Sequence, residues 1–137
     1  MPGIPLSVAC IGLGRIGAGI ARNIQVSGCR LTVYNRNPKK TEPFVASGAA
    51  RAGSPREAAA AADIVITCLM DDNSVLENMK GSDGILAGMR PGAIHIGTST
   101  ISPNASTQLA GLHAAQGSYY VAAPVLGRID AAEAGNL

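Results

Sequence analysis

Three glycines near the start of the chain, spaced G-x-G-x-x-G, constrain the fold more than any other feature. Gly12, Gly14 and Gly17 follow the short apolar run 6–12 (LSVACIG) and precede a stretch with apolar residues at helical spacing. In a strand–turn–helix unit, the first glycine allows the tight turn, the second lets a ligand approach the backbone, and the third lets the helix pack on the strand. The pattern therefore predicts a dinucleotide pyrophosphate at the helix N-terminus. The alternative, a glycine turn that binds nothing, is disfavoured by this context.

Strand and helix signals alternate along the rest of the chain. The segment 63–69 is almost continuously apolar and β-branched, as expected for a central strand covered on both faces. The order predicts a Rossmann-type doubly wound parallel sheet in three αβα layers, with the first strand central and the switch point beside Gly12. The expected strands are 6–12, 30–35, 49–52, 63–69, 93–97 and 118–123; the expected helices are 16–26, 37–48, 54–62, 72–79 and 102–116, with at most one further turn after residue 124.

Composition excludes several classes of protein. The 137 residues are about one domain in length, so we expect a single dinucleotide-binding domain over residues 1–137. The net charge of +2 is spread along the chain without a basic run, which argues against nucleic acid, and no span approaches the roughly 18 apolar residues of a membrane helix. Three widely spaced cysteines, Cys10, Cys29 and Cys68, indicate reduced residues in a cytoplasmic protein rather than a disulfide or a metal site.

The end of the second expected strand indicates which dinucleotide is preferred. NAD-specific folds usually place an acidic residue there, whereas this chain has Asn35 followed by Arg36. Lys39 and Lys40 follow on the next turn, so a 2′-phosphate would meet cations instead of a carboxylate. The sequence therefore favours NADP, with NAD still possible. The competing interpretation is that these cations are only the solvated start of a helix.

Five segments together resemble the β-hydroxyacid dehydrogenase family. They are GLGRIG, YNRNPKK, VITCL, GTSTISP and AAPVLGRIDAAEAGNL, and they cover essentially the whole chain. The family includes 3-hydroxyisobutyrate dehydrogenases and glyoxylate or succinic semialdehyde reductases, and it is related to 6-phosphogluconate dehydrogenases and imine reductases. The resemblance implies an NADP(H)-dependent oxidoreductase that acts on a small hydroxyacid, aldehyde or imine.

The resemblance also implies a set of cofactor contacts. They are the glycine turn with its intervening residues, the end of the second strand, the loop after the fourth strand, Ser74 where the family often has Asn, and Thr100 on the nicotinamide side. Ser99 is the implied substrate contact. The full cofactor set is Gly12, Leu13, Gly14, Arg15, Ile16, Gly17, Asn35, Arg36, Lys40, Cys68, Leu69, Met70, Ser74 and Thr100.

Several positions depart from the family pattern. Gly97 stands where the family has Asp, Met70 where it usually has Pro, and Leu126 where it commonly has Ser. The exchange at Leu126 favours a larger or more apolar substrate. Without the resemblance, Ser99 and Thr100 would be interpreted as a loop that caps the next helix.

No catalytic acid is expected in this chain. The family's proton donor is a lysine in a second, helical domain, whereas the lysines here are only residues 39, 40 and 80. We expect His95 to be a core residue and His113 to lie at the surface. Two hypotheses follow: a part of a longer enzyme, which joins a helical domain or a homo-oligomer through an apolar patch near 124–137, or a non-catalytic nucleotide-binding module.

Overall fold

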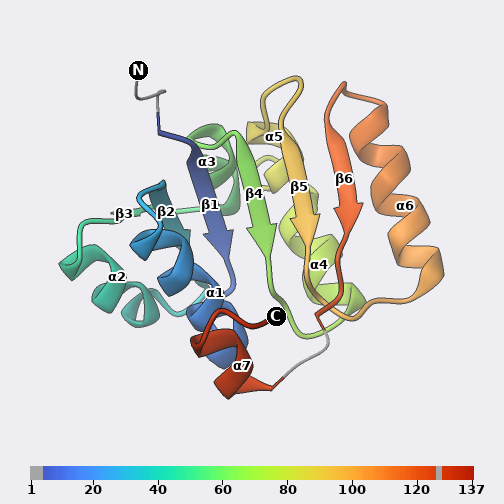
Figure 1. Ribbon diagram of the computed structural model, residues 1–137. Coiled ribbons are helices and arrows are strands. Elements are labelled where there is room, and N and C mark those ends of the chain that lie inside the picture. The colour runs from blue at the N-terminus through green and yellow to red at the C-terminus, as the bar shows by residue number, and fades with distance from the viewer. Residues whose placement is uncertain (1–4, 126–127) are drawn as a thin grey trace.

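The computed structural model describes residues 5–125 and 128–137 and contains one parallel sheet of six strands in the order β3-β2-β1-β4-β5-β6 (Figure 1). β1 pairs with β2 on one side and with β4 on the other, so the strand order reverses beside it, as predicted. The strands are β1 (Ser7–Ile11), β2 (Arg30–Tyr34), β3 (Ala50–Arg51), β4 (Ile64–Thr67), β5 (Ile94–Gly97) and β6 (Tyr119–Ala122).

Helices cover both faces of the sheet (Figure 1). On one face, α1 and α2 pack over β1 and β2; on the other, α3, α4, α5 and α6 pack over β1, β4 and β5. The three-layer prediction is therefore confirmed. The helices are α1 (Arg15–Val26), a 3-10 turn η1 (Pro38–Thr41), α2 (Glu42–Ala46), α3 (Pro55–Ala60), α4 (Asp72–Met79), α5 (Ile85–Gly88), α6 (Pro103–Ala114) and α7 (Ile129–Glu133).

Strand β1 contributes side chains to both hydrophobic clusters of the core. Val8 and Cys10 face the cluster under α1, whereas Ala9 and Ile11 face the cluster under α3 to α6. All four are buried, as alternation in a strand covered on both faces requires. Burial raises the pKa of the Cys10 thiol to about 12, with a smaller contribution from nearby Cys68, so Cys10 is a protonated core residue.

Side-chain caps fix the starts of four helical segments, where Asn37, Ser54, Asp71 and Ser102 each accept a backbone N–H. The Ser54 hydroxyl accepts the Glu57 N–H of α3, and the Glu57 carboxylate reaches back to the Gly53 N–H at 2.6 Å. The expected helix 37–48 is divided into η1 and α2, because Pro43 starts a new helical segment. Helix α5 was not predicted, because four residues are too few for a helical periodicity to appear in the sequence.

Two histidines form one buried hydrogen-bonded chain with Thr67. His95 Nε2 lies 2.8 Å from Thr67 Oγ1, His95 Nδ1 lies 3.2 Å from His113 Nε2, and His113 Nδ1 lies 2.7 Å from the Leu109 carbonyl oxygen. A carbonyl only accepts, so His113 donates from Nδ1, His95 donates to His113, and Thr67 donates to His95. The prediction for His95 is confirmed. The surface prediction for His113 was wrong, because its side chain is fully buried against β5.

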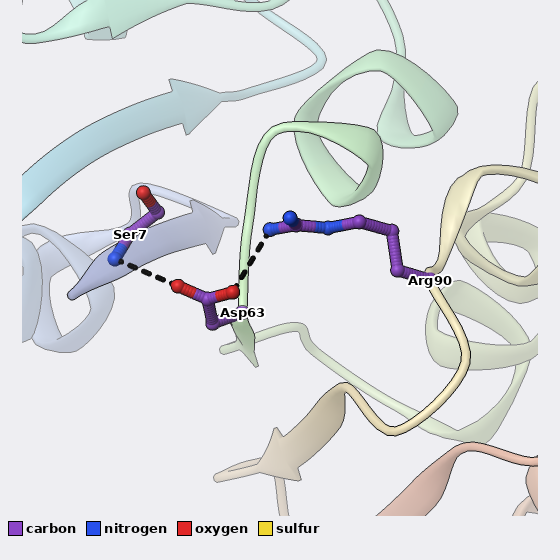
Figure 2. A network of polar contacts seen from close by, with 3 residues as sticks. All are labelled: Ser7, Asp63 and Arg90. Atoms are coloured by element: carbon purple, nitrogen blue, oxygen red, sulfur yellow. Dashed lines mark hydrogen bonds and ion pairs between the residues drawn. The ribbon is translucent and has the colours of Figure 1, made fainter.

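Asp63, which directly precedes β4, contacts Ser7 at the start of β1 and Arg90, which precedes β5 (Figure 2). Its carboxylate accepts the Ser7 N–H at 3.3 Å and pairs with the Arg90 guanidinium at 3.0 Å. Both partners of this ion pair are about half exposed, so it contributes little beyond positioning.

The exposed apolar surface differs from the expectation. Among the described residues, the large exposed apolar side chains after residue 100 are Tyr119 and Val121 on β6 and Leu137 at the end of the chain. In the expected patch near 124–137, the large exposed apolar side chain among the described residues is thus Leu137, whereas the edge strand β6 exposes two such side chains. None of the described helices combines the length and apolarity needed to cross a membrane.

Candidate dinucleotide-binding site

The glycine turn joins the carboxyl end of β1 to α1. Gly12 has φ +95°, and its N–H donates to the Tyr34 carbonyl at 3.0 Å. A Cβ at Gly12 would collide with the Cys68 carbonyl oxygen, and a Cβ at Gly17 would collide with the Gly12 carbonyl oxygen. The first and third glycines are therefore required by the packing of the protein itself.

Gly14 differs from the other two glycines. A Cβ there would meet nothing within 4 Å, and its φ of −65° suits any residue. Gly14 is also the N-cap of α1, and no side chain caps that helix. By contrast, Ser54, Asp71 and Ser102 each accept a backbone N–H at the starts of α3, α4 and α6. The start of α1 thus presents backbone N–H groups to open space, an arrangement that attracts an anion.

Asn35 connects the end of β2 to the glycine turn. Its Oδ1 accepts the Leu13 N–H at 2.8 Å, and its Nδ2 donates to the Asn37 carbonyl at 3.0 Å. The Leu13 side chain is buried in the core, so Leu13 contributes to the turn through its backbone. Asn35 therefore holds the turn while keeping this position uncharged.

A cavity of about 840 Å³ lies at the carboxyl ends of β1, β2 and β4. Twelve of the sequence-predicted site residues line it; Leu13, Ser99 and Thr100 do not. The twelve are Gly12, Gly14, Arg15, Ile16, Gly17, Asn35, Arg36, Lys40, Cys68, Leu69, Met70 and Ser74.

Charges of both signs surround this cavity. Four cationic side chains, including Arg36 and Lys40, line it together with the carboxylates of Glu77 and Asp83. Arg36 and Lys40 are exposed and lie beside Asn35 at the end of β2, whereas Lys39 is not part of the lining. Arg36 and Lys40 thus place two cationic side chains near the end of β2.

Hydrogen bonds of Ser99 and Ser102 join the loop after β5 to the segment that follows β4. Ser99 is buried, and its Oγ accepts the Leu69 N–H at 2.8 Å, which leaves its own proton free to donate. Thr100 is exposed. Asp72 accepts both the Ser102 N–H, at 2.9 Å, and the Ser102 hydroxyl, at 2.6 Å. The Asp72–Ser102 contact was not predicted, since its partners are 30 residues apart.

Tyr120 occupies the space that a side chain at position 97 would need. A Cβ at Gly97 would lie 2.7 Å from the Tyr120 hydroxyl oxygen and 3.0 Å from its ring. The carboxylate that the resemblance implies at position 97 is thus replaced here by a glycine and a tyrosine from the next strand. Leu126, another of the three departures from the family pattern, lies outside the described residues.

One wall of the cavity comes from a residue that sequence reasoning missed. Ile129, at the start of α7, lines the cavity together with Gly14, Arg15 and Ile16 of the glycine turn and α1. No local pattern indicates this contact, because α7 and α1 are more than a hundred residues apart.

A second hollow of about 880 Å³ lies at the amino ends of the strands and includes Arg30, Asp63 and Arg90. It is as large as the first, but ligands of open parallel sheets bind at the carboxyl ends, where the strand order reverses. The cavity beside the glycine turn is therefore the candidate site.

Comparisons with known proteins agree with this fold and site. Residues 7–137 match the model of a family described as the NAD binding domain of 6-phosphogluconate dehydrogenase. The chain belongs to this family of nicotinamide-dinucleotide-binding domains.

Its relatives include oxidoreductases, among them 3-hydroxyisobutyrate dehydrogenases, and also the cytokine-like nuclear factor N-PAC of Homo sapiens, which is 32% identical over 120 residues that cover 88% of this chain and 22% of that protein. The chain is 53% identical over 127 residues to an uncharacterized oxidoreductase, YfjR, of Bacillus subtilis, a match covering 93% of this chain and 44% of that protein. The solved structure of Mycobacterium tuberculosis 3-hydroxyisobutyrate dehydrogenase with L-serine superposes with a TM-score of 0.87 at 31% identity, over 96% of this chain and 44% of that one. Psf3 in complex with NADP+ and 2-OPP gives a TM-score of 0.88 at 32% identity, over 93% and 45%. The chain thus spans less than half the length of each.

Proposed function

We propose that this chain is the NADP(H)-binding domain of an oxidoreductase that transfers hydride between the nicotinamide and a small hydroxyacid, aldehyde or imine. Residues 1–137 would form one cofactor domain, and the substrate chemistry belongs to the whole protein. The odd number of widely spaced cysteines supports a cytoplasmic location.

The open space beside Gly14 is the observation that best supports this proposal. Packing explains Gly12 and Gly17, but nothing in the described chain contacts the open side of Gly14. A pyrophosphate that rests directly on this backbone would require glycine there, and the uncapped start of α1 would supply N–H donors and the positive end of the helix dipole.

The end of β2 supports NADP over NAD. Asn35 offers no carboxylate to repel a 2′-phosphate, and its side chain is already engaged with Leu13 and Asn37. Arg36 and Lys40 line the same end of the cavity with side chains exposed to solvent. An Arg fork is suited to bidentate contact with phosphate oxygens. The complex of Psf3 with NADP+ is consistent with this choice.

The remaining residues would position the nicotinamide half. The cofactor, once bound, supplies or accepts the hydride. Cys68, Leu69 and Met70 would lie under the riboses, with Ser74 contacting the cofactor from α4. Ser99 fixes the Leu69 backbone and retains a hydroxyl proton to donate toward substrate, with Thr100 beside it. The replacement of the family's Ser by Leu126 favours a larger or more apolar substrate.

The second candidate, a non-catalytic nucleotide-binding module, is favoured by one observation. Among the described residues, both histidines are buried and already hydrogen-bonded, so neither offers a proton at the cavity. A histidine that donates a proton would then have to come from a second domain or from a partner subunit.

Titration calorimetry with NADPH and NADH tests the proposal. We expect NADPH to bind more tightly than NADH. Arg36→Ala should reduce the difference between the two binding free energies by about 1 to 3 kcal/mol, the scale of a charge-assisted contact. Lys39→Ala is the matched control, because Lys39 is a nearby cation that does not line the cavity. Equal affinities in the unaltered chain would overturn the NADP assignment, and no binding of either would overturn the cofactor site.

A further inference from the structure

The amide of Asn23 joins the last helix of the chain to the first. From α1, its Nδ2 donates to the carbonyl oxygens of Ala132 at 2.9 Å and Glu133 at 3.2 Å, both in α7. The same nitrogen donates to the Gly19 carbonyl of its own helix at 2.8 Å. Asn23 is partly buried between the two helices, so its amide is enclosed by carbonyl partners on both.

The C-terminus of α7 leaves carbonyls that Asn23 can satisfy. The chain turns through Gly135 at φ +75°, and the N–H groups of Gly135 and Asn136 bond back into the last turn of α7. This glycine-ended cap uses only part of the acceptor capacity of the final carbonyls. Asn23 completes the cap from another helix. A side chain at Gly135 would crowd the Asn23 Oδ1, at 3.2 Å from its Cβ.

Close packing next to Asn23 depends on Gly19. A Cβ at Gly19 would lie 2.9 Å from the Ala132 carbonyl carbon and 3.0 Å from the Ala132 Cβ, and Ala132 itself is buried. Ala132 therefore sits directly on the α1 backbone, and α1 is the main neighbour of α7. Gly19 permits the contact and Asn23 locks it in register.

The contacts of Asn23 and Gly19 with α7, which together form the lock between α1 and α7, determine where Ile129 lies. Ile129 begins α7 and lines the dinucleotide cavity beside Gly14, Arg15 and Ile16. Figure 1 shows α7 against α1, at the same end of the sheet as the glycine turn. Since α7 has only five residues, a shift at its C-terminal cap moves the whole helix.

We propose that Asn23 is a positioning residue for the dinucleotide: through Ala132 and Glu133 it fixes α7, and α7 holds Ile129 as a wall of the cavity. The proposal rests on the proposed function of this site. It predicts that Asn23, which does not line the cavity, controls cofactor affinity through Ile129.

Two variants of the 137-residue chain break the lock in different ways. Asn23→Asp keeps the shape but places carboxylate oxygens against carbonyl oxygens, and Gly19→Ala inserts a methyl group under Ala132. Asn104→Asp makes the same chemical change at an exposed position of α6, and Gly111→Ala adds a methyl group where nothing lies within 4 Å. Amide hydrogen exchange should accelerate over residues 129–137 in the first pair, with β1 and β4 still protected, and should not change in the controls.

A double-mutant cycle on NADPH affinity separates positioning from a general loss of stability. Ile129→Ala should weaken NADPH binding about ten-fold and Asn23→Asp about five-fold. Asn23→Asp added to Ile129→Ala should weaken it less than about two-fold further, because the contact through which Asn23 acts is already gone.

Each outcome has a distinct meaning. If the unaltered chain binds no dinucleotide, the proposed function fails, and the inference about affinity fails with it. If the chain binds NADPH, multiplicative effects of the two substitutions would overturn the positioning role of Asn23 and leave the proposed function standing. Unchanged exchange over residues 129–137 in both Asn23→Asp and Gly19→Ala would overturn it as well. If Asn23→Asp does not fold, the cycle is run with Gly19→Ala.

Discussion

The Oδ1 atom of Asn35 accepts the backbone N–H of Leu13 at 2.8 Å, and this bond joins the end of β2 to the glycine turn. One side chain therefore shapes the turn and also determines the charge beside Arg36. These two roles are separable by a substitution that changes the charge and keeps the acceptor.

Asn35→Asp is predicted to shift the preference from NADPH toward NADH. The carboxylate can still accept the Leu13 N–H, but it loses the donor to Asn37 and repels a 2′-phosphate. We expect NADPH binding to weaken about ten-fold or more, with NADH binding unchanged or improved. Calorimetry on both cofactors measures this, with Asn104→Asp as the control for added charge. A parallel loss for both would show that the turn, and not the charge, was altered.

Alanine substitutions at Gly14 and Gly17 are predicted to affect different properties: Gly17→Ala lowers stability, whereas Gly14→Ala lowers the affinity for NADPH. Gly17→Ala puts a methyl group against the Gly12 carbonyl and should lower the free energy of unfolding by about 1 to 3 kcal/mol. Gly14→Ala meets no protein atom and should cost less than about 1 kcal/mol, yet it should weaken NADPH binding about ten-fold. Chemical denaturation and calorimetry give the two numbers. Unchanged NADPH affinity in Gly14→Ala would contradict a pyrophosphate at this position.

The Thr67–His95–His113 chain is predicted to make the fold sensitive to mild acid. Burial, together with the nearby His113, lowers the pKa of His95 to about 3, and burial also lowers the pKa of His113. Both are near 6.5 when unfolded, so the unfolded state binds more protons below that pH. The contribution of the neutral histidines to the free energy of unfolding is complete above pH 6.5 and is lost as the pH falls toward 3. For His95, the free energy of unfolding falls by about 1.4 kcal/mol per pH unit in this range.

Urea denaturation between pH 5 and pH 7.5 measures this slope. The window lies above the ordinary range of carboxylates, so acid titration of Asp71, whose pKa is lowered by its hydrogen bonds from Ser74, falls outside it. His95→Gln cannot ionise and should lose less stability on acidification, although it is less stable at pH 7.5. A free energy of unfolding that stays constant across the window would contradict the buried neutral chain.

The 137-residue chain is predicted to bind NADPH and show negligible turnover. Serine and threonine hydroxyls are weak acids, and both histidines are enclosed in the core, so none of Ser99, Thr100, His95 and His113 is suited to give a proton to a substrate at neutral pH. The test is the loss of reduced-nicotinamide absorbance with glyoxylate, succinic semialdehyde and a cyclic imine. Robust turnover with any of these would show that an acid within the chain is at work.

Local signals were sufficient to predict most of the fold. Glycine turns, capping residues and apolar runs act over a few residues. They therefore made it possible to predict a parallel sheet with β1 central and the position of Gly12, Asn35 and the loop after β4 at the cavity. His113 was misassigned because its burial depends on His95, a partner on a different element. The contacts of Asn23, Ile129 and the Gly97–Tyr120 pair likewise arise only when distant elements pack.

The contact between Asn23 and Ala132 spans 109 positions in the chain. Closing so long a loop is entropically expensive, so contacts of this kind form after the local strand–helix units have formed. The glycine turn and its helix can therefore form early, whereas Ile129 reaches its place in the cavity only after α7 has packed against α1. A ribosome-bound chain that ends before Ile129 would already display the turn, but it would hold a dinucleotide in an open-sided cleft.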